Sequence, residues 1–351
     1  MREIYGWIGK VLRVDLSEDK VSEEDVSRYI EDFIGGLGLS MRLLWNEVSP
    51  GIDPFDPTNP LIFMTGPLTG TLAPTSGRGI VCTVAPGVEP PMPTRSGMGG
   101  EWPAFLKYAG YDGIIVKGVA EKPTYLYIND GEVELRDATE LWGLDTYETQ
   151  KRLMKICGDD AKIVCIGPAG EKLVRFSAIL SGSGYAAAKV GMGAVMGSKK
   201  LKAIVVKGTG AIKIAHPKEF IEICHHVRRL IMNHPVSEWT CQGPIPGTVD
   251  FVKKYRVRKE SCFNCPVHCR AWIKLPGVES GEAMCLSWYY LWLGAKNDHA
   301  AWKGKVLADK LGLCQYQLYD MLRWLKKLYD EGLITEKETG IPWSKFGDEN
   351  F

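Results

Sequence analysis

The sequence predicts an α+β protein, with a β-rich N-terminal domain over residues 1–210 and a mostly helical domain over residues 211–351. Up to about residue 210, short runs of β-branched and aromatic residues are separated by Gly, Pro, Asn and Asp, which is the pattern of strands and turns. From His216 onward, apolar residues recur at helical spacing. A length of 351 residues also suits two domains, at about 150 residues each.

The elements expected in the first half begin with a strand, a turn and a second strand, followed by a helical segment that contains several glycines. More strands follow, around a Gly- and Pro-rich stretch, and then helix and strand alternate. In order, these segments are 9–26, 27–48, 59–86, 107–138, 145–170 and 175–208. The clearest hairpin signal is Asn129-Asp130-Gly131-Glu132, because Asp-Gly suits the turns that join two strands directly. In the second half, 216–234 and 303–334 carry helical periodicity.

Composition narrows the kind of protein. Hydrophobic residues make up 45% of the chain and charged residues 24%, which is ordinary for a globular protein with a full core. The net charge of +1 gives no basic field, so we expect no nucleic-acid partner. The apolar runs are too short to span a bilayer, and the N-terminus lacks the order of a signal peptide. We therefore expect a cytoplasmic protein without a membrane span.

Three of the ten cysteines are clustered at Cys262, Cys265 and Cys269, within the segment ESCFNCPVHCRAW. In a cytoplasmic chain, clustered cysteines indicate metal ligands or redox groups rather than disulfides. No paired C-x-x-C or histidine pair follows, as a closed zinc site would need. Iron–sulfur clusters are often held by a short cysteine run with a distant last ligand. The spacing therefore favours a [4Fe-4S] site, with zinc as the alternative.

Glycine-rich loops occur three times in the first half, at 66–78, 94–102 and 186–199. Glycine lets the backbone approach a ligand closely, and successive amides can hold anionic oxygens. None of the loops has the G-x-G-x-x-G pattern after a first strand, and none carries a phosphate-loop lysine. Each loop alone is typical of a tight turn. Three in one domain favour a cofactor that carries phosphate.

Long stretches of the chain resemble the tungsten-containing aldehyde:ferredoxin oxidoreductase family. They include YGWIGKVLRVDL, FIGGLGLSMRLLWNEV, NPLIFMTGPLTGTLAPTSGR, KYAGYDGIIVKG, IGPAGEKLVRFSAI and GMGAVMGSKKLKAIVVKG, and they cover residues 1–210 almost continuously. The cysteine trio occupies the place where this family has three cluster ligands, and DKLGLC at 309–314 matches its D-x-x-G-L motif. The resemblance implies a base domain that holds a tungsten or molybdenum bis-pterin cofactor, covered by helical domains, with a [4Fe-4S] cluster nearby.

The resemblance also assigns roles to individual residues. Arg78 is expected to bridge pterin and cluster, and Ser96–Gly100 to line one pterin. Residues 187–191 are expected to bind pterin phosphate or Mg²⁺, and Asp309 to accept hydrogen bonds from a pterin amine. The complete predicted cofactor set is Arg78, Ser96, Gly97, Met98, Gly99, Gly100, Ala187, Ala188, Lys189, Gly191, Asp309, Gly312 and Leu313.

Several positions depart from the family pattern. Lys189 stands where the family has an arginine, which keeps the charge but loses the planar fork. Glu282 lies near the place of a catalytic glutamate, and we expect it to assist proton transfer. The stretch SGEAMCLSW is closer to the tungsten subunit of the benzoyl-CoA-reducing complex, so Cys285 is either a tungsten ligand or a buried thiol. Cys314 is a further candidate for the fourth cluster ligand.

The resemblance implies that the family's third domain is absent from these 351 residues. The expected function is oxidation or reduction of an aldehyde or carbonyl-type substrate, with electrons exchanged with ferredoxin or an iron–sulfur subunit of a larger complex. Two alternatives remain: a low-potential reductase subunit acting on an aromatic or thioester substrate, and an electron-transfer paralogue completed by another polypeptide.

Overall fold

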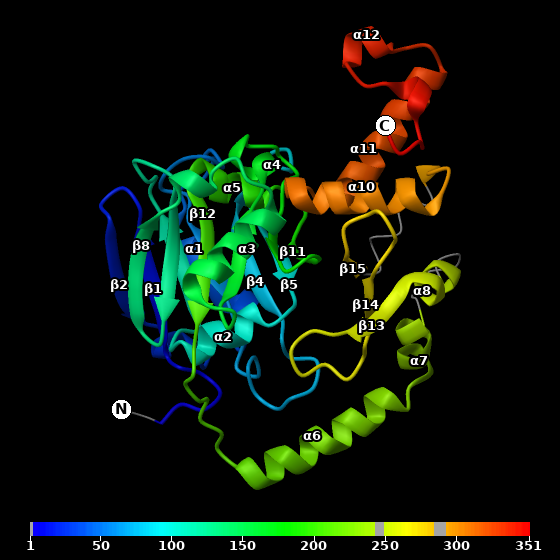
Figure 1. Ribbon diagram of the computed structural model, residues 1–351. Helices are drawn as coiled ribbons and strands as arrows, with labels where there is room; N and C mark the ends of the chain where they lie inside the picture. Colours follow the sequence, from blue (N-terminus) through cyan, green and yellow to red (C-terminus); the bar gives the residue numbers. More distant parts are fainter. Residues whose placement is uncertain (1–2, 243–248, 284–292) are drawn as a thin grey trace.

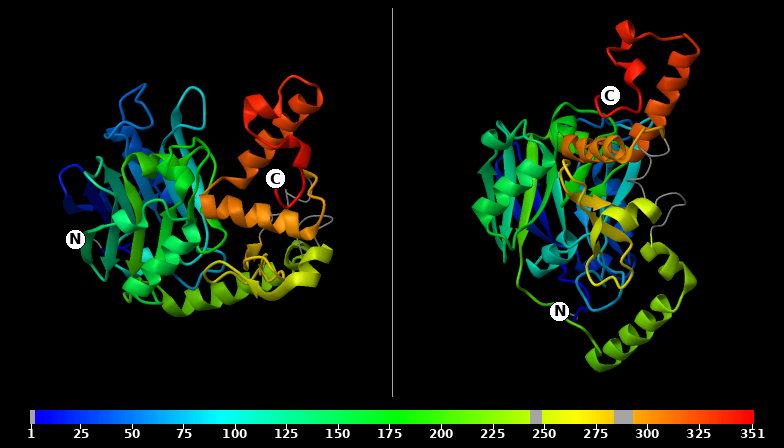
Figure 2. Two further views of the ribbon diagram at one scale, coloured as in Figure 1. Left: turned by 45° about the horizontal axis from the view of Figure 1, so that its top comes forward. Right: turned by 45° about the vertical axis from the view of Figure 1, so that its right-hand side comes forward.

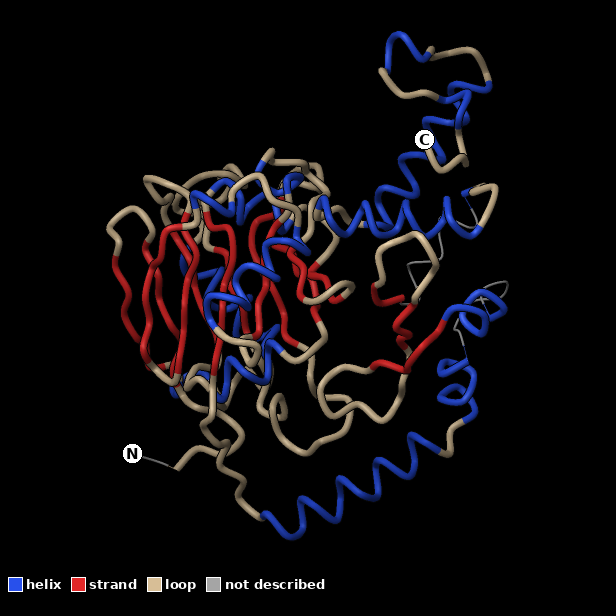
Figure 3. Tube along the Cα trace, in the orientation of Figure 1, coloured by secondary structure: helices blue, strands red, loops and turns tan. Residues whose placement is uncertain are grey.

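The computed structural model describes residues 3–242, 249–283 and 293–351. Its first half is a sandwich of two six-stranded mixed sheets, seen on the left of Figure 1. The second half carries most of the long helices and one small sheet, as the red and blue segments of Figure 3 show. The predicted α+β class is therefore confirmed. The predicted domain boundary near residue 210 stays a prediction.

The first sheet joins strands from both ends of residues 10–117. Its spatial order is β2 (Lys20–Asp25), β1 (Lys10–Asp15), β6 (Gly113–Lys117), β3 (Leu61–Met64), β4 (Gly79–Ala85) and β5 (Met92–Met98). β1 runs parallel to β6, and the other neighbours are antiparallel. The strand–turn–strand expected at 9–26 is the pair β1–β2.

The second sheet is built from residues 124–207. Its spatial order is β11 (Tyr185–Ala187), β10 (Ile179–Ser181), β9 (Lys162–Ile166), β12 (Leu201–Lys207), β7 (Thr124–Asn129) and β8 (Glu132–Asp137). The predicted hairpin at 129–132 is confirmed: β7 and β8 pair antiparallel, with Asn129 opposite Glu132. Asp130 and Gly131 have φ values of 45° and 93°, so both lie in the left-handed region that this turn requires.

Alternation along the strands explains why the two sheets pack on each other. In β12, Ile204 and Val206 point into the core between the sheets, whereas Ala203 and Val205 point to the outer face. Side chains in a strand alternate between its two faces, so strands buried on both sides read as continuous apolar runs. KAIVV is such a run, and so is KIVCI in β9.

Helices cover the outer faces of both sheets. The helices of the first half are α1 (Gly36–Glu47), α2 (Trp102–Tyr108), α3 (Thr146–Cys157), α4 (Pro168–Glu171) and α5 (Met192–Ser198), with 3₁₀ turns at Ser27–Tyr29 and Thr139–Leu141. Leu39, Leu43 and Leu44 of α1 pack on the first sheet, and Leu153 of α3 packs on the second. The segment 27–48 is helical only from Gly36, so Gly35 is the residue before the helix and Gly36 and Gly38 lie in its first turn.

The second half leaves the sandwich after β12. Its elements are α6 (Pro217–Met232), α7 (Pro235–Gln242), α8 (Val249–Tyr255), β13 (Arg256–Glu260), β14 (Arg270–Ile273), β15 (Gly281–Ala283), α10 (Asp298–Leu311), α11 (Gln315–Asp330), α12 (Glu336–Thr339) and a 3₁₀ turn at Trp343–Lys345. The two views of Figure 2 show α6 as an arm along one side, with α11 and α12 projecting from the opposite end.

Strands β13, β14 and β15 were not expected in the helical half. They form a three-stranded antiparallel sheet. Each has three to five residues, and RVRKE and RAWI mix charged and apolar residues without clear alternation. Short strands of this kind are fixed by their neighbours rather than by their own pattern.

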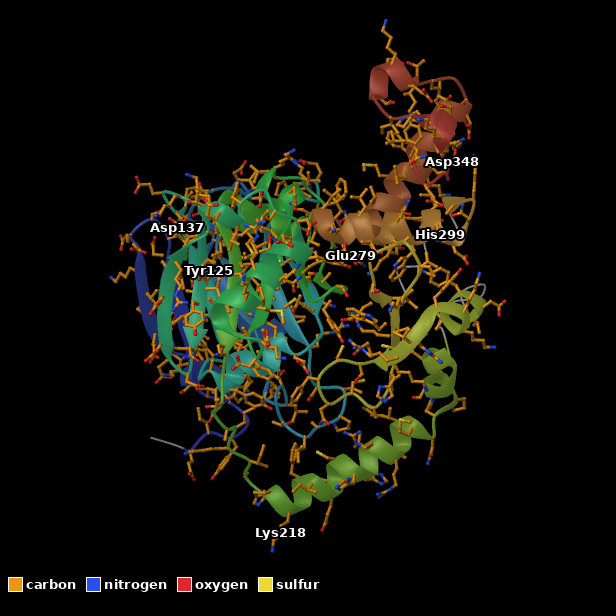
Figure 4. All side chains as sticks on the ribbon, viewed as in Figure 1. Tyr125, Asp137, Lys218, Glu279, His299 and Asp348 are labelled. Atoms are coloured by element: carbon orange, nitrogen blue, oxygen red, sulfur yellow. The ribbon has the colours of Figure 1, made fainter. Side chains whose placement is uncertain are left out.

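Ion pairs and a hydrogen bond hold α10 against α3 of the sandwich and against the segment before β15. Lys310 Nζ lies 2.6 Å from a carboxylate oxygen of Glu279 and 3.3 Å from one of Asp145, which caps α3. Figure 4 shows Glu279 just beneath α10. Thr146 of α3 also donates its hydroxyl to the Asp309 carbonyl at 2.8 Å. Within the described ranges, no helix is long and apolar enough to cross a membrane.

The β7–β8 turn yields a test of the fold. Alanine at Gly131 meets no atom within 4 Å but must adopt φ 93°. We expect Gly131→Ala to lower the free energy of unfolding by about 1–2 kcal/mol, because only the backbone conformation is disfavoured. Gly38→Ala is the control: its Cβ makes an ordinary contact with Phe33 inside α1. There the free energy should rise, by up to about 1 kcal/mol. Denaturant unfolding measures both, and equal effects would contradict the turn assignment.

Candidate functional site

The predicted cysteine trio lies in the loop between β13 and β14. Cys262, Cys265 and Cys269 are all half-buried. The Cys265 amide donates to the Cys262 carbonyl at 3.1 Å, and the Cys269 amide donates to the Val267 carbonyl at 2.9 Å. Asn264 between them has φ 48°, a conformation that asparagine tolerates well. The spacing thus folds into one tight loop that carries three thiols.

This loop is seated directly on two glycines of the sandwich. A Cβ atom at Gly99 would stand 2.6 Å from Cys262 Sγ, and one at Gly77 would stand 2.8 Å from the Phe263 Cβ. The Phe263 amide donates to the Gly100 carbonyl at 3.1 Å. Only glycine permits so close an approach. Two of the three predicted glycine-rich loops therefore receive the cysteine loop.

Asn264 connects the loop to two other parts of the molecule. Its side-chain amide donates to the Ala73 carbonyl at 3.2 Å, and its side-chain oxygen accepts from Arg228 of α6 at 2.7 Å. The sequence had singled out neither Asn264 nor Arg228. The two partners of Asn264, Ala73 and Arg228, lie 191 and 36 positions away from it along the chain. His268 is exposed in the same loop.

The predicted pterin loops come together at the end of β5. The Ser96 hydroxyl donates to the Ala188 carbonyl, across 92 positions of sequence. Lys189, Val190 and Gly191 follow one another with φ values of 71°, 51° and 82°. Three successive left-handed residues turn the backbone sharply, which is costly for Lys and especially for Val. Lys189 itself is exposed, with its ammonium 5.3 Å from the Tyr316 ring centroid.

Arg78 lies beside these loops. It follows Gly77, on which Phe263 packs, and a Cβ at Gly97 would stand 3.2 Å from the Arg78 side chain. Arg78 therefore runs along β5, between the cysteine loop and the Ser96–Gly100 segment, with its side chain exposed. Met98 is fully buried in the core between the sheets, so its contribution to a pterin site is its backbone.

Asp309 is buried at the C-terminal end of α10. One of its oxygens lies 2.6 Å from Lys305 Nζ and accepts from the Tyr147 hydroxyl at 3.4 Å. The other accepts from the Gln315 side-chain amide. Lys305 also donates to the Ser183 carbonyl at 2.8 Å. The predicted acceptor is thus held by protein donors on both oxygens.

Gln315 adds an acceptor that the sequence did not reveal. Its side-chain oxygen is buried and has no hydrogen-bond partner within the described part of the chain. A buried polar atom without a partner costs about 1–3 kcal/mol. Since its amide end is fixed on Asp309, the Asp309–Gln315 pair presents one unused acceptor to a donor from outside.

Gly312 and Leu313 anchor the motif on the sandwich. Gly312 has φ 77°, and a Cβ there would stand 2.8 Å from the Gly167 amide nitrogen. The Gly312 carbonyl accepts from the Ala178 amide at 2.7 Å, and Leu313 pairs with Ser177 in an isolated antiparallel β-bridge. Cys314 donates its amide to the Phe176 carbonyl at 2.9 Å and is 1% exposed.

Cys314 as the fourth cluster ligand stays a prediction. Its backbone bond to Phe176 lies at the junction of α10 and α11, which Figure 1 shows high on the sandwich, whereas the β13–β14 loop lies near its base. In the described ranges, no three His, Cys, Asp or Glu side chains converge on one point as ligands of a single metal ion. A cluster requires less, because each thiolate binds a different iron. Cys285 lies outside the described residues.

Glu282 of β15 is buried, 6% exposed, and pairs with Arg270 at 3.0 Å. Its backbone amide donates to the Ser183 hydroxyl at 2.8 Å. Burial raises the pKa of Glu282 above its ordinary value, and Arg270 and Lys305 oppose that rise. A buried carboxyl group with a raised pKa suits proton transfer.

Two observations are compatible with the expected groups. The Cys262 thiol stands against Gly99, where a side chain would not fit, which suits a cluster enclosed by protein. The unused Gln315 acceptor beside Asp309 suits the amine edge of a pterin, which carries donors.

Comparison with known proteins gives matches along nearly the whole chain. The family described as "Aldehyde ferredoxin oxidoreductase, N-terminal domain" matches residues 11–208. The family described as "Aldehyde ferredoxin oxidoreductase, domains 2 & 3" matches residues 234–351.

Curated relatives include two tungsten-containing aldehyde ferredoxin oxidoreductases. The one from Pyrococcus horikoshii is 37% identical and the one from Pyrococcus furiosus 36%, each over 96% of this chain and 61% of its own length. The WOR-like subunit of aliphatic sulfonate oxidoreductase from Pyrococcus furiosus is 30% identical over 99% of this chain. This chain therefore spans about three fifths of the length of the curated relatives it matches.

A solved structure is also similar. It is the active site complex BamBC of benzoyl coenzyme A reductase in complex with 1,5-dienoyl-CoA, with a TM-score of 0.87 and 31% identity. The match covers 95% of this chain and 57% of that one.

Thiol chemistry tests the assignment of the trio. Burial raises the pKa of Cys82 and Cys165 to about 12, so at pH 8 both stay protonated and unreactive. We expect alkylation of the metal-free protein to modify Cys262, Cys265 and Cys269 and to spare Cys82 and Cys165. Loading with iron and sulfide should then protect the trio, as mass spectrometry of the peptides can measure. Equal labelling before and after loading would contradict a cluster at this loop.

Proposed function

This chain belongs to the aldehyde ferredoxin oxidoreductase family, and we propose that it forms the cofactor-binding part of a tungsten oxidoreductase. The proposed reaction transfers electrons between an aldehyde or other carbonyl-type substrate and ferredoxin, through a [4Fe-4S] cluster. The same residues suit a molybdenum form. The observation that carries the proposal is the close contact of the cysteine loop with Gly77 and Gly99, in which the Cys262 thiol and Phe263 lie against the predicted pterin loops.

The proposed cluster ligands are Cys262, Cys265 and Cys269. The proposed pterin contacts are the backbone of Ser96–Gly100, the loop 187–191 with its Mg²⁺ or phosphate site, Arg78, and the Asp309–Gln315 pair with Gly312 and Leu313 behind it. When bound, a tungsten bis-pterin supplies two-electron chemistry at the metal, and the cluster passes single electrons onward. Arg78 lies along Gly97 and next to Gly77, so it is placed to contact both.

Glu282 is the proposed proton carrier. Its carboxyl group is buried and ion-paired with Arg270, and burial raises its pKa, which supports a role in accepting a proton. Arg270 at 3.0 Å fixes one carboxylate oxygen and leaves the other for a substrate-side proton.

A second candidate function is that of a low-potential reductase subunit for an aromatic or thioester substrate. The similarity to the benzoyl coenzyme A reductase complex over 95% of the chain supports it. In that version Cys285 is the proposed tungsten ligand, since a soft thiolate suits a sulfur-rich metal.

Partners and location follow as proposals. Because one curated relative is a subunit and the similar solved structure is a complex, we propose that this chain works with other polypeptides, either an electron-transfer subunit or further copies in an oligomer. A cytoplasmic location is part of the same proposal.

Replacing Asp309 tests the pterin assignment. Asp309→Asn keeps an oxygen for Lys305 but loses the charge, so a charge-assisted bond worth about 1.5–3 kcal/mol is weakened. We expect the pterin content per chain to fall several-fold, and Gln315→Ala to lower it as well. Fluorescence of the oxidised pterin measures the content. Asp320→Asn on the exposed side of α11 is the matched control. Unchanged content in both site variants would refute the assignment.

Cys285 separates the two candidate functions. If Cys285 binds tungsten, X-ray absorption at the tungsten edge should show one more sulfur neighbour in the wild type than in Cys285→Ser. A thiolate ligand occupies the position that an aldehyde oxidase needs for the transferred oxygen. Equal sulfur counts, with aldehyde oxidation that Glu282→Gln abolishes, favour the aldehyde version. The assay uses the complex as isolated, with all of its polypeptides.

A further inference from the structure

Arg270 is a buried cation directly after the last cysteine of the trio. It is the first residue of β14, and its side chain is 7% exposed. Three elements enclose the guanidinium. Glu282 of β15 lies 3.0 Å from it, the Tyr185 ring centroid lies 3.7 Å from its central carbon, and a Cβ at Gly184 would stand 3.2 Å from Nη1. Nothing in the sequence pattern had singled out this arginine.

Tyr185 connects the surroundings of Arg270 both to the cysteine loop and to the predicted pterin segment. The Tyr185 hydroxyl donates to the Ser261 carbonyl at 2.7 Å, one residue before Cys262. The other face of the Tyr185 ring is close to Gly100, where a Cβ would stand 3.0 Å from the ring. The stacked pair of Arg270 and Tyr185 therefore lies between the predicted pterin segment and the loop.

The charges near Arg270 are unequal. Glu282 supplies one carboxylate, and the thiols of Cys262 and Cys269 lie within electrostatic reach of the guanidinium. With the trio in the thiolate form, more than one negative charge acts on Arg270, and Lys305 is a second buried cation that acts on Glu282. Interactions between charges are several times stronger in such surroundings than in water.

We propose that Arg270 is the positioning residue of the cluster: its charge, anchored by Glu282 and Tyr185, stabilises the more reduced state of a cluster held by Cys262, Cys265 and Cys269. The proposal rests on the cluster of the proposed function. Nearby charge is one of the factors by which a protein sets a cluster's reduction potential. A fixed cation favours the form with one more electron and so raises that potential. Glu282 has the opposite sign and moderates the effect.

Because Arg270 and Glu282 carry opposite charges, removing each charge should shift the midpoint potential of the cluster in opposite directions. Arg270→Gln should shift the midpoint potential of the cluster to more negative values, and Glu282→Gln should shift it to more positive values. Electron paramagnetic resonance during a redox titration of the iron-loaded protein measures both shifts. Arg258→Gln is the matched control, because Arg258 is exposed on the neighbouring strand, pairs with Glu260 and stacks on Trp272. In Arg258→Gln, the midpoint potential of the cluster should stay at the wild-type value.

Arg270→Lys separates charge from shape. It keeps the charge but loses the planar fork, so the potential should stay closer to wild type than in Arg270→Gln while the iron content falls. Full iron content with an unchanged potential in Arg270→Gln would overturn the inference and leave the cluster assignment standing. If Arg270→Gln binds no iron, an unchanged or more negative potential in Glu282→Gln overturns it instead. Wild-type protein that binds no iron would overturn the cluster and this inference together.

Discussion

The close approach of the cysteine loop to Gly77 and Gly99 is the contact on which the rest of the site depends. One partner comes from the β-sandwich and the other from a loop more than 160 positions later, so neither half of the chain builds the site alone. Side chains at either glycine would push the loop away by the width of a methyl group or more. Hydrogen bonds of Asn264 in the loop with Ala73 and Arg228, and of Tyr185 with Ser261, then hold the loop in place.

A second shared element is the short turn between β10 and β11, which joins the two ends of the proposed cofactor site. The Ser183 carbonyl accepts from Lys305, which pairs with Asp309. The Ser183 hydroxyl accepts from the amide of Glu282, which pairs with Arg270. Burying two ion pairs costs desolvation energy that apolar side chains would avoid. Their concentration beside the glycine loops agrees with a site that handles charged cofactors.

The sequence predicted the parts of the fold that local pattern controls. The Asp130-Gly131 turn, the apolar runs of β9 and β12, and the loop made by the cysteine spacing all follow from neighbouring residues. The resemblance supplied Ser96, Arg78 and Asp309 as candidates. The sequence missed β13–β15 because these strands are short and lack clear alternation. It missed Arg270 because its partner is distant: Arg270 stacks on Tyr185, 85 positions earlier in the chain. It missed Gln315 because an unpaired buried oxygen shows only in the folded chain. The sequence also offered Cys314 as a candidate fourth ligand, because the G-L-C pattern does not reveal that the Cys314 backbone is hydrogen-bonded to Phe176 of the sandwich.

Iron-edge X-ray absorption of the reconstituted chain tests the central claim most directly, namely that residues 262–269 on their glycine seat hold an iron–sulfur cluster. The account predicts iron surrounded mainly by sulfur, with further iron atoms as near neighbours, and loss of this signal in Cys265→Ser. Iron bound by oxygen and nitrogen alone, or a single zinc in its place, would contradict it.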